Sequence, residues 1–143
     1  MSHDEKQLAS DLALAVVRLA RQLRGHRQHS AVSLTQLSAL STLFSEGPMT
    51  PGALAARERV QPPSMTRVIG SLADVGLVDR MPHPSDGRQI IVSLSEAGKA
   101  LVQNEKDARE AWLAAQLRNL RSAELTSLRE AVDTMTELMK TCD

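Results

Sequence analysis

The chain has 143 residues, of which 42% are hydrophobic and 24% charged, and its 17 basic side chains balance 17 acidic ones. This length and composition are typical of one soluble globular domain. A formal net charge of zero argues against a nonspecific coat for nucleic acid. It still allows a local basic surface, because binding depends on where the charges lie.

The scarcity of aromatic residues and cysteine excludes several kinds of site. One Trp, one Phe and no Tyr offer little stacking surface for unpaired bases, which disfavours binding to single strands or RNA loops. The single cysteine, Cys142, cannot form a disulfide within the chain and argues against a cysteine metal cluster. The sequence shows neither a signal-peptide pattern nor an apolar run of about 18 residues. We therefore expect a cytoplasmic protein with no membrane partner.

Residues 5–27 carry apolar side chains at helical spacing, which predicts a first amphipathic helix. Ser33 and Gln36 have the spacing of a capping box and predict the start of a second helix. Gly47-Pro48 is expected to end it. The predicted buried side of this second helix consists of Leu37, Leu40, Leu43 and Phe44.

Two further helix starts follow. Thr50-Pro51 combines a hydroxyl cap with proline at the first helical position, and predicts a short helix over residues 51–58. Pro62-Pro63 presets the first turn of another helix, which Gly76 is expected to end. Its predicted apolar face consists of Met65, Val68, Ile69, Leu72 and Val75. Ser64, Arg67 and Ser71 fall together on the opposite face.

Residues 77–81 are predicted to form a short strand, and residues 90–94 to form the strand that returns beside it. The intervening residues 82–88 include two prolines, Ser, Asp and Gly, a composition typical of a turn. The result is a hairpin with Arg88 at its tip.

Ser95-Glu96 is expected to begin a long helix that runs to about Asn119. Its predicted apolar side consists of Ala97, Leu101, Ala108, Trp112 and Ala115. Ser122 is expected to cap a last helix. The apolar residues of that helix follow the 3-4-3-4 spacing of packed helices: Leu125, Leu128, Val132, Met135 and Met139.

This order of helices and strands describes a winged helix-turn-helix. The expected fold class is therefore mainly α with a small β-hairpin wing, joined to a helical dimerisation region. We expect one domain over residues 1–143, in which residues 30–95 bind DNA and residues 1–29 and 96–143 dimerise. The apolar stripes of the first helix and the last two exceed what one small core needs, which favours a symmetric homodimer.

A series of short motifs extends from the fourth helix to the start of the fifth. They read Ser64-Met65-Thr66-Arg67-Val68-Ile69, Val75-Gly76-Leu77-Val78, Pro84-Ser85-Asp86-Gly87-Arg88 and Val92-Ser93-Leu94-Ser95-Glu96-Ala97-Gly98. In combination they resemble the MarR family of transcriptional regulators, and the resemblance covers essentially the whole chain. The chain departs from the family pattern at two positions. Gly87 stands where many members carry a wing arginine, and Ser95 stands where Thr is common.

The resemblance implies a sequence-specific regulator that binds double-stranded DNA as a homodimer. Its two recognition helices would enter successive major grooves of a pseudo-palindromic operator, about 34 Å apart. The resemblance also implies repression, relieved when a small aromatic or anionic effector changes the spacing of the two helices. The expected pocket-lining residues are Leu37, Leu40, Phe44 and Trp112. We expect no cofactor and no enzymatic activity, since no phosphate loop, nucleophile elbow or acid–base pair is found.

The residues expected to contact DNA lie at the start of the recognition helix and at the hairpin tip. They are Gln61, Pro63, Ser64, Thr66, Arg67, Asp86, Gly87 and Arg88. A helix N-terminus favours phosphates or base edges through its free N–H groups and partial positive charge. Arg67 is predicted to donate to a guanine edge or to a phosphate, and Arg88 to enter the minor groove.

Each of these assignments has a structural alternative. Thr66 could bond back within its own helix, with Arg67 merely solvated. Asp86 could hold the guanidinium of Arg88, or it could form an Asx-type turn in which Arg88 is incidental. His83 is interpreted as a solvated residue of the wing.

Basic residues near the end of the first helix recur every third position and spread over half of its surface: Arg18, Arg21, Arg24 and Arg27. We interpret them as a solvated helix end; contact with an anionic ligand or with flanking phosphates is the alternative. His26 and His29 have no acidic or thiol partner nearby in sequence, so no metal site is predicted.

A winged helix used only for dimerisation or protein docking, without its own operator, is the alternative function. A salt titration separates the two functions, because affinity for DNA falls steeply as salt rises.

Overall fold

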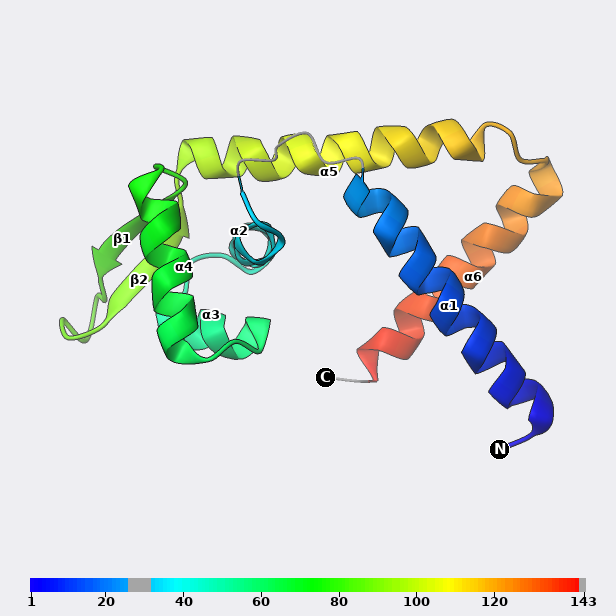
Figure 1. Ribbon diagram of the computed structural model, residues 1–143, viewed down its shortest axis with the longest axis horizontal. Coiled ribbons are helices and arrows are strands. Elements are labelled where there is room, and N and C mark those ends of the chain that lie inside the picture. Colours follow the sequence, from blue (N-terminus) through cyan, green and yellow to red (C-terminus); the bar gives the residue numbers. More distant parts are fainter. Residues whose placement is uncertain (26–31, 142–143) are drawn as a thin grey trace. The chain divides into compact units, whose positions relative to one another are not determined.

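The computed structural model describes residues 1–25 and 32–141. Within these residues it contains six helices and one two-stranded antiparallel sheet (Figure 1). The elements are α1 (His3–Gly25), α2 (Leu34–Glu46), α3 (Pro51–Glu58), α4 (Pro62–Asp74), β1 (Val78–Pro82), β2 (Ile90–Leu94), α5 (Glu96–Leu117) and α6 (Ser122–Lys140). This mainly helical architecture with a hairpin wing confirms the predicted fold class.

The chain divides into two compact units. One, the winged-helix unit, spans residues 27–108, and the other, the helical unit, combines residues 1–26 and 109–143. The winged-helix unit extends beyond residue 95, the limit expected from the sequence. The first turns of α5 explain the difference, because Gly98, Leu101 and Val102 are buried there.

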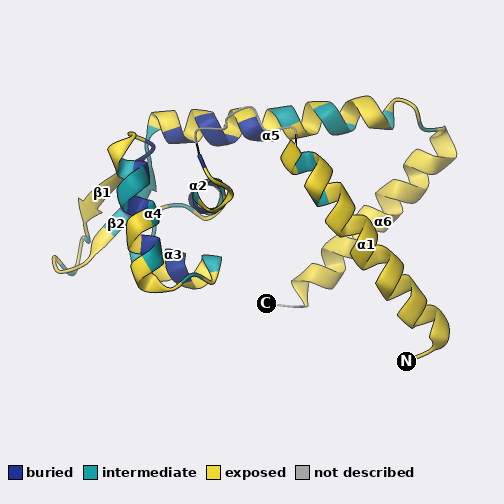
Figure 2. Ribbon diagram, viewed as in Figure 1, coloured by how far each residue is buried: buried dark blue, intermediate teal, exposed yellow. Residues whose placement is uncertain are grey.

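The core of the winged-helix unit is apolar and draws on every one of its elements. Buried residues gather on α2, α3, α4, the hairpin and the start of α5 (Figure 2). Burying a side chain of this kind is worth roughly 1.5–3 kcal/mol. The largest fully buried apolar side chains are Leu40, Leu54, Met65, Leu72 and Val92.

Local capping chemistry sets the helix boundaries as predicted. The Ser33 hydroxyl accepts a hydrogen bond from the Gln36 N–H at 3.1 Å, and the Gln36 side chain accepts one from the Ser33 N–H at 2.8 Å. Thr50 caps α3 by accepting from the Ala53 N–H at 3.1 Å. Gly47 and Gly76 follow α2 and α4 with φ angles of 89° and 77°, in the region that favours glycine.

The wing is a regular antiparallel hairpin. Val78 lies opposite Leu94, and Pro82 lies opposite Ile90. Met49 adds a short bridge to Val92 through two backbone hydrogen bonds of 2.8 and 3.1 Å. The first strand begins one residue later than expected, and Pro82 ends it instead of opening the turn. Proline is tolerated at such an edge position because no ladder bond requires its missing N–H.

Three apolar residues of the winged-helix unit predicted to lie on buried faces are exposed, and so is Ala115 in the helical unit. Phe44 is 40% exposed because α2 buries Ala39, Leu40 and Leu43 instead. Val75 is 66% exposed because α4 has already ended at Asp74.

Ala97 is exposed because α5 buries a neighbouring stripe at i, i+3, i+4 and i+7. That stripe consists of Gly98, Leu101, Val102 and Glu105.

The start of α6 also differs from the expectation, since Arg121 is the N-cap and Ser122 is the first helical residue. The Glu124 carboxylate accepts from the backbone N–H of Arg121 at 3.1 Å and from its Nε at 3.0 Å. These bonds, the backbone one foremost, hold the pKa of the Glu124 carboxyl below its ordinary value.

The helices of the helical unit carry little buried surface. Neither α1 nor α6 has a buried residue among those described, and both are coloured as exposed along nearly their whole length in Figure 2. In the described chain, no helix has the length and apolar character needed to cross a membrane.

α5 packs directly onto the turn that follows α4. Ser95 caps α5 by accepting from the Gly98 N–H at 3.1 Å, and its own N–H donates to the Leu77 carbonyl at 3.1 Å. Gly98 is buried against the same carbonyl so closely that a Cβ there would overlap the Leu77 oxygen. This is a close backbone approach that only glycine permits.

Gly98→Ala is therefore expected to destabilise the fold by about 1–3 kcal/mol, the usual cost of overpacking, because backbone must move. Urea denaturation followed by circular dichroism measures the change. Gly70→Ala is the matched control, since a Cβ at Gly70 meets nothing within 4 Å. It should be neutral or stabilising, and equal destabilisation by the two variants would contradict the packing argument.

Candidate DNA-binding interface

The start of α4 presents a polar, uncapped helix end. Gln61 is its N-cap but makes no side-chain capping bond. Pro62 and Pro63 occupy the first two helical positions and carry no N–H. This end therefore offers a phosphate or base edge fewer backbone N–H groups than expected from the sequence, and the N–H of Ser64 is among those that remain.

Two of the predicted DNA-contacting residues make bonds within α4. The Thr66 hydroxyl donates to the Pro62 carbonyl at 3.0 Å, which is the back-bonded alternative for this residue. The Arg67 Nη2 donates to the Ser64 hydroxyl at 3.2 Å. Arg67 is exposed, and a guanidinium has five N–H donors. The contact with Ser64 therefore orients Arg67 and leaves most of its donors available.

The wing tip is organised by the imidazole of His83. Its Nδ1 accepts hydrogen bonds from the backbone N–H of Ser85 at 3.1 Å and of Asp86 at 3.2 Å. Two backbone bonds close the turn, from His83 N to Gln89 O and from Gln89 N to Asp86 O, both 3.0 Å. His83 is thus a structural element of the wing and not simply a solvated residue. The sequence offered no sign of this role.

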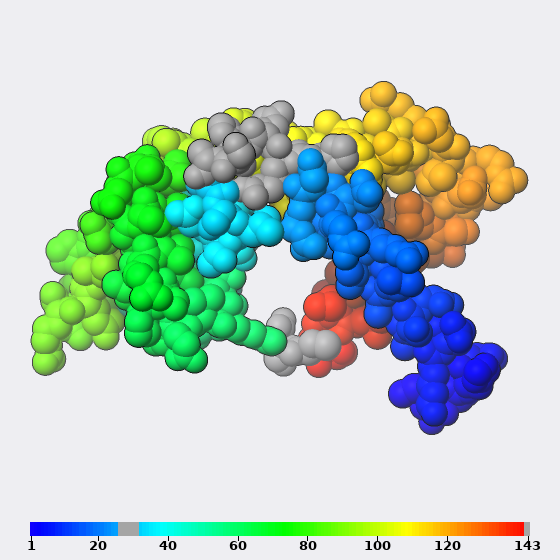
Figure 3. Space-filling view, viewed as in Figure 1, coloured from blue at the N-terminus to red at the C-terminus, as the bar shows by residue number. Residues whose placement is uncertain are grey.

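Asp86 combines both roles considered for it. Its Oδ1 accepts from the Arg88 N–H at 3.1 Å, which is an Asx-type turn, and lies 3.5 Å from Nε of the same arginine. The Arg88 side chain is 94% exposed. Its guanidinium is therefore held at one edge while the rest projects into solvent. Figure 3 shows the hairpin loop, in yellow-green, projecting from the winged-helix unit.

The wing and the start of α3 face each other across a shallow depression of about 340 Å³. Thr50, Pro51 and Gly52 line one wall. Arg88, Gln89 and Ile90 line the other. The start of α3, the first helix of the helix-turn-helix, and the wing arginine therefore line the same depression of the winged-helix unit.

The turn between α3 and α4 contains Arg59, whose backbone lies in the left-handed region with φ 54°. Few residues other than glycine and asparagine adopt this conformation, so it could not be predicted from the sequence. The Glu58 carboxylate, beside Arg59, accepts from the hydroxyls of Ser38 at 3.0 Å and Thr42 at 3.2 Å. These two bonds fasten the end of α3 to α2.

Ser71 does not join Ser64 and Arg67 on an open face as expected. It is half-buried, and its hydroxyl accepts a hydrogen bond of 2.8 Å from Nε2 of Gln36 on α2. The same hydroxyl donates to the Val68 carbonyl at 2.8 Å. The far end of the recognition helix is thus tied to α2.

The four residues expected to line an effector pocket differ in burial and in the unit to which they belong. Leu40 is fully buried in the core, and Leu37 packs against that core. Phe44 lines a cavity of about 400 Å³ together with Met81, Leu94 and Lys99. Trp112 is half-buried and belongs to the helical unit. Of the four, Phe44 therefore lines this cavity of the winged-helix unit.

Other candidates from the sequence can be placed only in part. Arg18, Arg21 and Arg24 are exposed on α1. Arg27, His26, His29 and Cys142 lie outside the described residues. Among the described residues, no group of three His, Cys, Asp or Glu side chains could hold a metal ion.

A helix-turn-helix followed by an exposed hairpin with an arginine at its tip defines the winged-helix class of DNA-binding proteins. Comparison with known proteins narrows this class. Residues 32–90 match the model of the MarR family. An HTH-type transcriptional regulator of Mycobacterium tuberculosis is 60% identical over 139 residues, which is 97% of either chain. One of Mycobacterium leprae is 59% identical over the same share.

Solved structures agree with this assignment. A Pseudomonas aeruginosa protein proposed to be a transcriptional regulator matches with a TM-score of 0.88 and 30% identity, over 97% of this chain and 98% of that one. MarR from Escherichia coli matches in fold, with a TM-score of 0.76, at 22% identity and over 90% and 95% of the two chains. The chain belongs to the MarR family and is a DNA-binding transcriptional regulator. Its relatives are regulators and not enzymes, as expected.

His83→Ala is expected to loosen the wing tip, because two backbone donors lose their acceptor. Hydrogen exchange at the amides of Ser85 and Asp86, followed by NMR, should become faster. His83→Asn is the matched variant, since its side-chain oxygen can accept in place of Nδ1 and should restore much of the protection. Unchanged exchange in His83→Ala would show that the imidazole does not organise the turn.

Proposed function

We propose that this regulator is a homodimeric repressor that binds a pseudo-palindromic operator and is released by a small aromatic or anionic effector. Each copy would place α4 in a major groove and Arg88 in the adjacent minor groove. One observation carries the proposal. The same chain has a helix-turn-helix with an exposed wing arginine, and also two fully described helices, α1 and α6, that have no buried residue. We further propose that it acts in the cytoplasm.

The exposed apolar faces of α1 and α6 support the homodimer. On α1 the large apolar residues exposed on one face include Leu8 at 66% and Leu19 at 44%, and on α6 they include Leu128 at 42% and Val132 at 43%. A contiguous apolar surface of this kind is uncommon on a monomer and marks an interface. A second copy would cover both faces, as symmetric association predicts.

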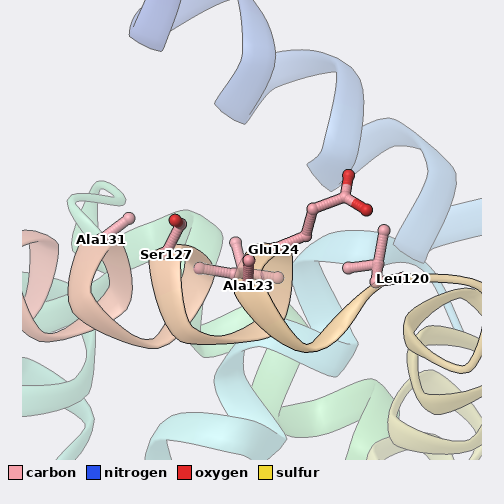
Figure 4. Close-up of a pocket in the computed structure, with 6 residues that line it drawn as sticks. Leu120, Ala123, Glu124, Ser127 and Ala131 are labelled. Carbon is pink, nitrogen blue, oxygen red and sulfur yellow. The ribbon is translucent and has the colours of Figure 1, made fainter.

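Two apolar depressions mark where such a copy could pack. One, of about 390 Å³, lies within the helical unit and is lined by residues including Leu19, Leu117 and Leu128. The other, of about 470 Å³, lies along α6 (Figure 4). Small residues recur there every fourth position, at Ala123, Ser127 and Ala131, so that a neighbouring helix could approach closely.

The proposed DNA contacts differ in how strongly they depend on the DNA sequence. Arg67, exposed and braced by Ser64, is suited to bidentate donation to a guanine edge. Arg88 is suited to phosphate or minor-groove contact, which is less dependent on sequence. Gln61, Pro63, Ser64 and Thr66 would fit the start of α4 against the groove, and Asp86 and Gly87 would shape the wing.

For the effector we propose the cavity that Phe44 lines. Its wall is mainly apolar, from Leu43, Phe44, Met81 and Leu94, while Lys99 supplies a cation. An apolar cavity with a single cation suits a small aromatic acid. This placement replaces the pocket of Leu37, Leu40, Phe44 and Trp112 inferred from the sequence, of which it keeps Phe44.

Leu128→Asp is expected to dissociate the homodimer, because it places a charge in the face that a second copy would bury. Sedimentation velocity measures the change, and affinity for the operator should fall with it. Thr126→Asp is the control, since it adds the same charge to α6 two positions away, on another face. Leu128 is already 42% exposed, so the fold of the single chain is spared. A Leu128→Asp protein that remained dimeric would rule out this interface.

Arg67→Ala and Arg88→Ala are expected to weaken DNA binding in different ways. Arg67→Ala should lose about 1–3 kcal/mol on the preferred site and much less on an unrelated duplex. Arg88→Ala should weaken both and lower the slope of log affinity against log salt. Fluorescence anisotropy of labelled duplexes over a salt series measures these effects. The preferred site comes from selection of bound fragments from random duplexes.

Arg118→Ala provides the matched control, because Arg118 is an exposed arginine beyond α5 in the helical unit. It should leave both affinities unchanged. Equal losses for Arg67→Ala on all duplexes would assign Arg67 to phosphate. Unchanged binding by Arg88→Ala would refute the role of the wing. Repeating the selection with small aromatic acids tests release by an effector.

A further inference from the structure

Gln36 connects the start of α2 to the recognition helix through both ends of its side-chain amide. The oxygen closes the α2 capping box by accepting from the Ser33 N–H at 2.8 Å. The nitrogen donates to the Ser71 hydroxyl of α4, also at 2.8 Å. One planar amide group makes both bonds. The position of the Ser71 hydroxyl is therefore linked to the position of the Ser33 backbone at the start of α2.

Ser71 passes this constraint to the backbone of α4. Its hydroxyl accepts from Gln36 and donates to the Val68 carbonyl at 2.8 Å, so both partners fix its rotamer. The hydroxyl is half-buried, where a hydrogen bond competes less with water than it does on an open surface. The chain of contacts therefore runs from Ser33 through Gln36 and Ser71 into the main chain of the recognition helix.

This bond differs in kind from the other contacts between α2 and α4. Those contacts are apolar, made by core residues such as Leu40 and Leu72. Apolar burial is non-directional and tolerates small rotations of one helix on another. A hydrogen bond weakens steeply when its angle changes. In the described part of the chain, Gln36 to Ser71 is the only side-chain hydrogen bond between α2 and α4.

We infer that Gln36 is a positioning residue that sets the orientation of the recognition helix on α2 and makes it depend on an intact α2 cap. The inference rests on the proposed function, since it concerns how α4 is presented to the operator. The bond from Gln36 to Ser71 would thus orient α4 on α2, as the bonds of Glu58 orient α3 on α2.

Ser71→Ala tests this role, because it removes the link while leaving both bonds of the capping box in place. Without the bond, the orientation that matches the groove is less populated, and apparent affinity falls with that population. We expect a loss of roughly 2- to 12-fold on the preferred operator, the bias that one hydrogen bond can supply. Affinity for an unrelated duplex and the salt slope should change far less, since phosphate contacts tolerate reorientation.

Ser71→Thr is the conservative variant, because it keeps a hydroxyl that can bond to the carbonyl one turn earlier. It should restore operator affinity. Ser41→Ala is the matched control. Ser41 is also half-buried, but its hydroxyl donates only to the Leu37 carbonyl of its own helix. It should leave discrimination between the operator and the unrelated duplex unchanged.

A second readout needs no DNA. Hydrogen exchange at the α4 amides, followed by NMR, should be faster in Ser71→Ala than in the wild type or in Ser71→Thr. Normal exchange together with normal discrimination in Ser71→Ala would overturn the inference. Equal losses on both duplexes would reduce Gln36 to a purely structural role and overturn it as well. If the wild-type protein bound no duplex, the proposed function would fail instead, and the exchange rates would still decide whether the link holds α4.

Discussion

The contact between α5 and the turn after the recognition helix is the constraint on which the winged-helix unit depends. Ser95 and Gly98 bring the first turn of α5 onto the carbonyl of Leu77, at the point where α4 has ended and β1 is about to begin. Three elements therefore meet with no side chain between them. One close approach of backbone thus fixes the end of α4, the base of the wing and the start of α5.

Within this frame, polar side chains hold the parts that are proposed to face DNA. Glu58 fastens α3 to α2, Gln36 fastens α4 to α2, and His83 with Asp86 shapes the wing tip. The apolar core supplies most of the stability but little angular definition. Hydrogen bonds supply direction. A few hydrogen bonds thus orient α3, α4 and the wing, while the apolar core holds them together without fixing their angles.

The sequence predicted those features that arise from neighbouring residues. The cap of α2 at Ser33, the cap of α3 at Thr50 and the end of α4 shortly before Gly76 all follow from chemistry within about four residues. The exposure of Phe44 and Val75 could not be predicted in this way. It depends on where the rest of the fold places each helix and on where α4 ends.

The candidate site shows the same division. The exposure of Arg67 and Arg88 was predictable from helix periodicity and turn composition. The bonds of His83 in the wing turn and the bond from Gln36 to Ser71 were not, since the first depend on the geometry of a whole turn and the second joins residues 35 positions apart. The left-handed conformation of Arg59 is likewise set by its surroundings and not by its own preference.

The lack of buried residues in α1 and α6 has a consequence for how the proposed homodimer would assemble and exchange subunits. In the proposed homodimer these helices would gain stability on meeting a second copy, so that folding of the helical unit and assembly would be coupled. Subunits would then be unable to swap partners without partial unfolding.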